Sequence, residues 1–166
     1  MQVRQIRETD AEAFVELCVQ VEAESEFMLI RPGERTATLE QQRQRLREIT
    51  ASDNSTILVA EHGGALVGYA AAVGGPYQRS RRTAHCVIGI RAAHIGRGHG
   101  ARLMQELEAW AGAHGIHRLE LEVMKTNARA IGLYNKMGFK FEGVRRDALY
   151  VDGAYVDDYY MAKLLE

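Results

Sequence analysis

Apolar positions recur at helical spacing in the first third of the chain, with polar residues between them. Four of them stand at i, i+3, i+4 and i+7 and predict one buried helix face: Phe14, Leu17, Cys18 and Val21. Thr9 precedes this stripe and Glu12 follows three residues later, a pair typical of a capping box at a helix start. Thr38 and Gln41 repeat that pattern and predict a second helix, whose few apolar residues suit a partly solvated cover.

Two further helices are predicted in the second half of the chain. Gly98–His114 has the strongest amphipathic pattern, and Gly115 is placed to end it. Asn127–Met137 is the other, and it stops at Gly138. Each follows a predicted strand, so each provides a crossover that permits parallel neighbours in a sheet.

Segments in which apolar and polar residues alternate predict the strands. They are Val3–Arg7, Thr56–Glu61, Ala65–Val73, Thr83–Arg91, Arg118–Met124, Phe139–Tyr150 and Tyr155–Leu164. Gly63-Gly64 and Asp152-Gly153 join two pairs of these strands as hairpins. The element order is therefore β-α-α-β-β-β-α-β-α-β-β. It predicts an α/β fold of the α+β type, with a mixed, mostly antiparallel central sheet flanked by helices.

Composition narrows the class of protein. The 166 residues, 46% of them hydrophobic, suit a single domain over residues 1–166 with a core of its own. A net charge of -1 argues against a nucleic-acid-binding protein. No apolar stretch reaches the roughly 20 residues of a membrane helix and the N-terminus lacks a signal-peptide pattern, so we expect a cytoplasmic protein with no membrane partner. Cys18 and Cys86 stand in apolar surroundings, as reduced core thiols do.

A glycine-rich loop precedes the strongest predicted helix. Gly96, Gly98 and Gly100 alternate there with Arg97 and His99. Glycines let several backbone amides approach one ligand, and a helix N-terminus favours an anion, so the expected ligand is a phosphate or pyrophosphate. The spacing also fits the G-x-G-x-x-A pattern of dinucleotide-binding proteins. Those proteins place the turn directly after their first strand and continue with several βαβ units, which this chain lacks.

Two segments resemble motifs of a known family. Ile95–Leu103, with the strand before it, resembles the acyl-CoA-binding motif of the GCN5-related N-acetyltransferase (GNAT) superfamily. Asn127–Phe139 resembles that family's next motif, N-x-x-A-x-x-L-Y-x-K-x-G-F, and the order of elements matches over nearly the whole chain. One position departs from the family pattern, because Ile95 stands where Gln or Arg is usual. Nearby Arg97 is the candidate replacement for that side chain.

The resemblance implies a binding site for acetyl-CoA. The family's pantetheine arm pairs with the strand before the loop as an extra strand would, which places it along Ile88, Gly89 and Ile90. Gly89 suits a close approach because it has no side chain. The pyrophosphate would take the loop amides of Gly96, Arg97, Gly98, His99, Gly100 and Ala101. Asn127 would hold the start of its helix and contact the pantetheine, and a plain helix N-cap is the other interpretation.

The resemblance also implies catalytic residues. Tyr134 matches the family tyrosine near the cofactor sulfur, where a phenol can donate to the departing thiolate; a core tyrosine is the alternative. A general base must also deprotonate the amine. His85 is the titratable residue within the central strand, although it alternates out of phase with the residues that would hold the arm. Glu24 and Glu26, in the irregular segment that would cover the acceptor side, are the rival bases.

The leading hypothesis is an enzyme that moves the acetyl group of acetyl-CoA to a primary amine of a small molecule or peptide. We expect direct transfer, because Cys86 has no paired histidine and suits a core thiol better than a nucleophile. A non-catalytic acyl-CoA-binding or sensing module is the alternative, and a dinucleotide-binding oxidoreductase is the third. No metal is expected, because the remaining histidines lack ligand spacing and suit a solvated surface: His94, His99, His114 and His117.

The predicted terminal hairpin raises two further expectations. Asp152, Asp157 and Asp158 would attract a cationic acceptor such as a polyamine or a basic peptide end, while solvation alone is the other explanation of such acids. The hairpin also has more aromatic surface than one sheet face needs, which predicts a homodimer. The residues concerned are Tyr155, Tyr159, Tyr160 and Met161.

Overall fold

A seven-stranded sheet organises the chain, in a computed structural model that describes all of residues 1–166. The strands are β1 (Gln2–Gln5), β2 (Thr56–His62), β3 (Ala65–Gly74), β4 (Thr83–Ile90), β5 (Arg118–Met124), β6 (Lys140–Val151) and β7 (Ala154–Leu164). The helices are α1 (Ala11–Glu24), α2 (Leu39–Ala51), α3 (His99–Ala113) and α4 (Ala128–Lys136), with short 3-10 turns η1 (Glu8–Asp10) and η2 (Ala92–His94).

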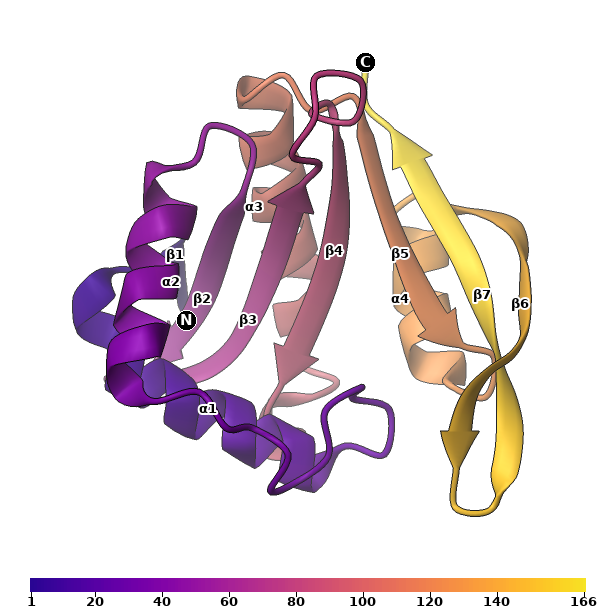
Figure 1. The fold of residues 1–166 in the computed structure, drawn as a ribbon, viewed down its shortest axis with the longest axis horizontal. Coiled ribbons are helices and arrows are strands. Elements are labelled where there is room, and N and C mark those ends of the chain that lie inside the picture. Colours follow the sequence, from indigo (N-terminus) through magenta and orange to yellow (C-terminus); the bar gives the residue numbers. More distant parts are fainter.

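The strands follow the order β1-β2-β3-β4-β5-β7-β6 (Figure 1). All neighbours are antiparallel except β4 and β5, which α3 connects as a parallel pair. The predicted order of helices and strands is confirmed, and so is the mixed, mostly antiparallel sheet. Both hairpin turns also lie where their glycines predicted, because Gly63, Gly64 and Gly153 adopt the positive φ that such turns require.

Helices cover the two faces of the sheet in pairs. Helices α1 and α2 lie on one face and α3 and α4 on the other, so that the sheet stands between two helical layers (Figure 1). Each layer has its own cluster of buried apolar side chains, with 20 residues on the α3 and α4 side and 10 on the α1 and α2 side. The faces of a strand alternate residue by residue, so the two clusters fix which side chains of β4 and β5 point to which layer.

One predicted capping box is confirmed and one is wrong. Thr38 accepts the amide of Gln41 and the Gln41 side chain accepts the amide of Thr38, so the reciprocal pair opens α2 as expected. The pair predicted at Thr9 does not form, because the chain there makes the 3-10 turn η1 and α1 begins only at Ala11. The Asp10 carboxylate holds that turn by accepting the amide of Arg7 at 2.7 Å.

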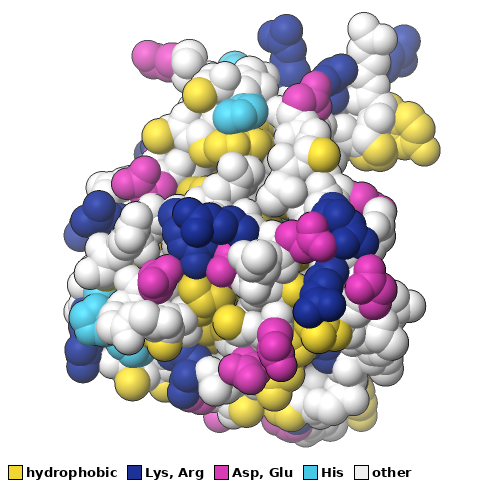
Figure 2. Space-filling view, turned by 90° about the vertical axis from the view of Figure 1, so that its left-hand side faces the viewer, with side chains coloured by type: hydrophobic (Ala, Val, Ile, Leu, Met, Phe, Trp, Pro, Cys, Tyr) yellow, Lys and Arg dark blue, Asp and Glu magenta, His cyan; other side chains and the backbone are white.

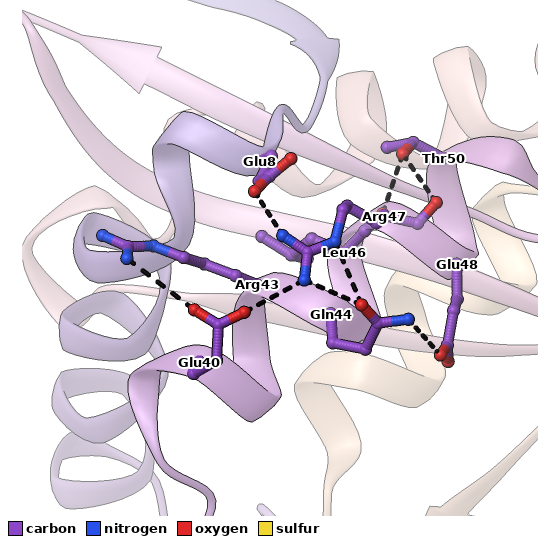
Figure 3. A network of polar contacts seen from close by, with 8 residues as sticks. All are labelled: Glu8, Glu40, Arg43, Gln44, Leu46, Arg47, Glu48 and Thr50. Atoms are coloured by element: carbon purple, nitrogen blue, oxygen red, sulfur yellow. Dashed lines mark hydrogen bonds and ion pairs between the residues drawn. The ribbon is translucent and has the colours of Figure 1, made fainter.

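A polar network fastens α2 to the preceding turn. The Arg47 guanidinium donates to Glu8 of η1 and to Glu40 and Gln44 of its own helix (Figure 3). These groups are exposed, and exposed ion pairs each contribute little to stability. Because the charges of this network satisfy one another, we read it as a helix attachment and not as a binding site.

The surface on the α1 and α2 flank shows no broad region of one charge. Lysine and arginine side chains are interspersed with acidic ones there, and histidine side chains gather at its lower left (Figure 2). Within the structure, no helix combines the length and the apolar character that a membrane crossing requires.

Candidate active site

The sheet opens between its two central strands. Strands β4 and β5 pair over only three residues, Thr83–His85 against Arg118–Glu120, and then separate (Figure 1). Strand β4 stays paired with β3 through Ile90, and β5 stays paired with β7 through Met124. The result is a V-shaped opening whose vertex lies just beyond His85 and Glu120.

The free edge of β4 faces this opening. Ile88, Gly89 and Ile90 bond to β3 on one side, while their other side lacks a strand partner. An extended ligand can therefore pair there as an added strand. Gly89 has a second role that the sequence did not show: a Cβ at this position would lie 2.6 Å from the Tyr69 ring. The missing side chain makes room for Tyr69 of the α1 layer, so packing alone already requires glycine.

The loop after β4 presents unused amides. Gly96 and Gly98 have φ of 78° and 80°, the left-handed region that glycine tolerates best. None of the amides from Gly96 to Ala101 donates to an acceptor within the chain, and Gly98 caps α3 without a side-chain bond. These amides and the positive end of the α3 dipole together form a site for an anion.

The residues around the loop differ in what they contribute: close packing, a free positive charge or a helix cap. Gly100 packs closely, since a Cβ there would lie 3.1 Å from Leu133 of α4. Arg97 is exposed and makes no ion pair, so it is free to meet an anion, whereas Ile95 offers no charge. Asn127 caps α4 by accepting the amide of Ala130 at 3.1 Å, which confirms the plain N-cap interpretation and leaves its amide nitrogen available.

Two titratable side chains stand together on the α1 face of the opening. His85 Nε2 lies 3.8 Å from Glu122 Oε2, and both side chains are partly exposed. Glu122 is the first outward-facing residue of β5 beyond the vertex, and Arg145 of β6 lies 3.2 Å from its other oxygen. Glu122 was not predicted as a site residue, because a glutamate at a polar position of the alternating strand Arg118–Met124 is typical of an ordinary solvent-facing strand surface.

Tyr134 lies in the opposite layer, on the α3 and α4 side of the sheet. It is 6% exposed and belongs to the apolar cluster of the α3 and α4 side, which also contains Cys86. Its hydroxyl makes no hydrogen bond within the chain. Burial raises the pKa of Tyr134, so the phenol stays protonated and has a proton to donate. The structure thus places the Glu122 carboxylate on the α1 face of the sheet and the Tyr134 phenol in the layer on the other face.

The rival bases are weaker candidates in the structure. Glu24 accepts from the Arg91 guanidinium at 2.9 Å and from the amide of Ala92, and these bonds lower its pKa. A carboxylate held in this way is a poor proton acceptor and instead anchors the end of β4 to α1. Glu26 is exposed in the segment after α1 and makes no ion pair.

Cys86 is unsuited to nucleophilic chemistry. It is 4% exposed, and burial raises the pKa of its thiol to about 12, so almost no thiolate exists near neutral pH. Its side chain points to the α3 and α4 layer, away from His85 on the same strand.

Of the four histidines predicted on a solvated surface, His114 and His117 are exposed, whereas His94 and His99 are only partly exposed. His94 and His99 meet His62 of β2 in a group of three rings, with centroids 5.6 to 6.4 Å apart. Loss of hydration lowers the pKa of His94 and that of His99. No group of three histidine, cysteine or acidic side chains is placed to hold a metal ion.

The irregular segment between α1 and α2 is tied across this face. Its Arg35 is bonded to Glu22 of α1, a carboxylate that is 3% exposed. Its Arg31 lies 3.1 Å from Asp152 at the tip of the β6–β7 hairpin. The segment therefore spans from the α1 layer to the β6–β7 hairpin, on the α1 side of the sheet (Figure 1).

Comparisons with known proteins agree with this geometry. The family model described as the acetyltransferase (GNAT) family matches residues 20–139. The N-alpha-acetyltransferase RimI of Mycobacterium tuberculosis is 37% identical over 117 residues, 68% of each chain. The L-amino acid N-acetyltransferase AaaT of Escherichia coli is 37% identical over 93 residues, 52% of this chain and 56% of that protein.

The fold agreement extends over the whole chain. The crystal structure of a GNAT-family acetyltransferase from Streptococcus pneumoniae superposes with a TM-score of 0.96 at 30% identity, covering 99% of both chains. The predicted fold and the expectation of an acetyltransferase are confirmed by these matches. The chain belongs to the GNAT family of acetyltransferases.

Proposed function

We propose that this chain transfers an acetyl group from acetyl-CoA directly to a primary amine of a small molecule or peptide. The observation that carries the proposal is the V-shaped opening between β4 and β5, with Glu122 on one face and Tyr134 on the other. The relatives support it, since their names describe acetylation of an α-amine and of L-amino acids.

The residues present fit acetyl-CoA. The unused amides of Gly96 to Ala101 suit its pyrophosphate, and the free edge of Ile88–Ile90 suits the amides of its pantetheine arm. From the loop, an extended arm along β4 leads back toward the vertex of the opening. When bound, acetyl-CoA supplies an acetyl group activated as a thioester.

Glu122 is the general base in this proposal. An ammonium has no lone pair, so a carboxylate on the α1 face removes its proton before the nitrogen forms a bond to the acetyl carbon. His85, at 3.8 Å, stands where it can pass that proton on or hold the carboxylate in place. Glu122 is thus the group that accepts the proton, and His85, predicted as the base from the sequence, assists it.

Tyr134 serves the leaving sulfur. As the bond between sulfur and the acetyl carbon breaks, negative charge develops on the sulfur, and a phenol can stabilise it by donating a hydrogen bond. The raised pKa of Tyr134 favours donation over full proton transfer, because a thiolate is a weaker base than that phenolate. The Cys86 thiol takes no part, which is consistent with direct transfer.

A turnover screen tests the proposed function. The purified chain is incubated with acetyl-CoA and panels of amino acids, peptides, diamines and aminoglycosides, and free thiol release is followed. Release that depends on one acceptor class, with the acetylated amine identified by mass spectrometry, is the expected result. Tight acetyl-CoA binding with no release for any amine would instead favour the sensing module.

The cofactor loop gives a first prediction. Gly98→Val is expected to weaken acetyl-CoA binding by at least about tenfold, because Gly98 stands among the unused loop amides and a side chain would add bulk where the amides meet the ligand. No atom of the chain lies within 4 Å of a Cβ at this position, so the added side chain does not clash with the protein itself. The left-handed φ adds strain of about 1–2 kcal/mol to the folded state. Gly115→Val is the matched control, with φ of 70° at the other end of α3. Calorimetric titration that finds equal affinities in the two variants would contradict the loop assignment.

We also propose that two copies of the chain associate through the terminal hairpin. Strand β6 forms a sheet edge, and apolar side chains remain exposed around it: Phe141, Val144, Tyr150, Tyr155 and Leu164. Burying them against a second copy would remove both the free edge and the apolar surface. Met161 does not belong to this surface, since it is 2% exposed in the core.

A dimer mass in light scattering at micromolar concentration is the expected result. Tyr155→Ser is expected to lower the average mass toward that of the monomer. A monomer mass for the unaltered chain would contradict the association.

We further propose a cytoplasmic location, which suits the two free, buried thiols Cys18 and Cys86.

A further inference from the structure

A group of three histidines lies beside the cofactor loop. His62 ends β2, His94 ends the 3-10 turn η2, and His99 is the first residue of α3. Every pair of these rings has its centroids 5.6 to 6.4 Å apart. Loop residues 95–98 connect His94 to His99, and His99 also contributes one of the unused amides. This three-histidine cluster is therefore contiguous with the anion site, so a charge on it would act on an anion bound there.

The cluster has no partner that could stabilise a positive charge. The Nδ1 atom of His94 is buried and has no hydrogen-bond partner. None of the three rings makes an ion pair, since among the histidines of the chain only His85 lies at that distance from a carboxylate. A buried polar atom without a partner is rare in folded proteins and calls for an explanation.

The acids of the neighbouring elements are engaged elsewhere. Glu24 of α1 accepts from the Arg91 guanidinium at 2.9 Å and from a backbone amide. Glu61, which precedes His62 in β2, lies 3.1 Å from the Arg4 guanidinium. Each of these carboxylates is already matched by an arginine. Protonation of the cluster therefore adds net positive charge to this end of the sheet.

Positive charges around the cluster oppose its protonation in the free protein. Arg91 and Arg97 act on His94. Arg97 and the α-amino group of Met1 act on His99, and the three rings act on one another. The positive end of the α3 dipole also disfavours a charge on His99. Loss of hydration, followed by these charges, lowers the pKa of His94 and that of His99.

We infer that the three-histidine cluster makes co-substrate binding proton-dependent, so that acetyl-CoA binds more tightly at mildly acidic pH. The inference rests on the proposed function, which places the pyrophosphate at the amides of Gly96 to Ala101. A bound pyrophosphate brings negative charge beside the rings, and this charge offsets the repulsion that keeps them neutral. Binding of the anion and protonation of the cluster then favour each other by the same factor.

The direction of the pH dependence follows from this linkage. The anion should raise the pKa of His94 and that of His99 above their values in the free protein. The extra affinity is therefore complete below the free-protein pKa values and is lost as pH rises through those of the complex. Because acetyl-CoA and CoA share the pyrophosphate, their affinities should shift together and the preference between them should not change.

Calorimetric titration with dephospho-CoA tests the inference. This ligand keeps the pyrophosphate but lacks the 3′-phosphate, a monoester that would itself titrate near pH 6. The unaltered chain is expected to bind it at least about fivefold more tightly at about pH 6 than at about pH 8, as screened charges several ångströms apart allow. Titrations in two buffers of different ionisation enthalpy should show that the protein takes up protons on binding.

Substitutions in the cluster separate charge from shape. The double variant His62→Gln with His94→Gln should lose most of the pH dependence, because glutamine carries no charge at any pH. His62→Lys, at an exposed position, carries a charge throughout and should bind dephospho-CoA more tightly than the unaltered chain at about pH 8. His114→Gln, at the other end of α3, is the matched control and should keep the pH dependence of the unaltered chain.

The possible failures are distinct. Equal or weaker affinity of the unaltered chain at the lower pH, or the same pH dependence in the double variant, would overturn the histidine inference and leave the cofactor site standing. The absence of acetyl-CoA binding at every pH would overturn the proposed function and this inference with it.

Discussion

Glu122→Gln is expected to lower kcat/KM for amine acceptors by roughly 10²–10⁴-fold, the usual contribution of a positioned general base. Glutamine keeps the size of the side chain and can still accept from Arg145, so the face of the opening should keep its shape. Only the ability to take a proton is lost. Acetyl-CoA affinity should stay close to that of the unaltered enzyme, because the loop and the β4 edge do not involve Glu122.

The neighbouring acid supplies the control. Glu120 is on the same strand and the same face, but it is bonded to Arg118 at 2.7 Å and lies at the paired end of the opening. Glu120→Gln should therefore retain most of the activity. In Glu122→Gln, the remaining activity should rise steeply with pH, because only the acceptor fraction that is already neutral reacts.

His85 decides between the two possible bases. If Glu122→Gln keeps more than half of the activity while His85→Gln loses it, the histidine is the base and the assignment of Glu122 is wrong. If both variants lose activity to a similar degree, the pair acts as one unit, as the 3.8 Å separation permits.

Tyr134→Phe is expected to lower kcat by roughly 10²–10³-fold, the usual effect of removing one donor to a developing negative charge. The ring and its packing against Phe139 remain, and the lost hydroxyl has no partner within the chain. The melting temperature should therefore change little. Because the phenol stays protonated over the neutral range, the loss should be similar across that range.

Tyr69→Phe is the matched control for this variant. Tyr69 is also 6% exposed and has a raised pKa, but it packs in the α1 layer against Gly89. Removal of the Tyr69 hydroxyl should leave kcat close to that of the unaltered enzyme. Full activity in Tyr134→Phe together with a lower melting temperature would show a core tyrosine, and the leaving sulfur would then need another donor.

Local sequence signals predicted the elements whose determinants are themselves local. The Thr38–Gln41 cap, the glycine turns and the stripe of α3 each depend on residues a few positions apart. The Thr9 cap failed because Asp10 is held by Arg4 of β1 as well as by the Arg7 amide, and that ion pair fixes a tighter turn. A contact with a neighbouring element outweighed the local preference.

The candidate site was only partly predictable for a related reason. The loop glycines, Asn127 and Tyr134 belong to contiguous motifs, so their positions were visible in the sequence. The place where β4 and β5 separate was not visible in the sequence, because it depends on where the backbone pairing between two distant segments ends. Glu122 becomes a site residue only through that separation; the same glutamate in a fully paired strand would be an ordinary surface residue.

The three residue pairs between β4 and β5 also divide the backbone ladder of the sheet into two halves. Four strands, β1 to β4, form one ladder, and β5, β7 and β6 form the other, with little backbone bonding between them. In the free protein, the halves are held together mainly by the apolar cluster on the α3 and α4 side, which takes side chains from both of them. A ligand strand laid in the gap would join the halves, so part of its binding energy becomes folding stability. The co-substrate is in this sense a missing structural member of the sheet as well as a reactant.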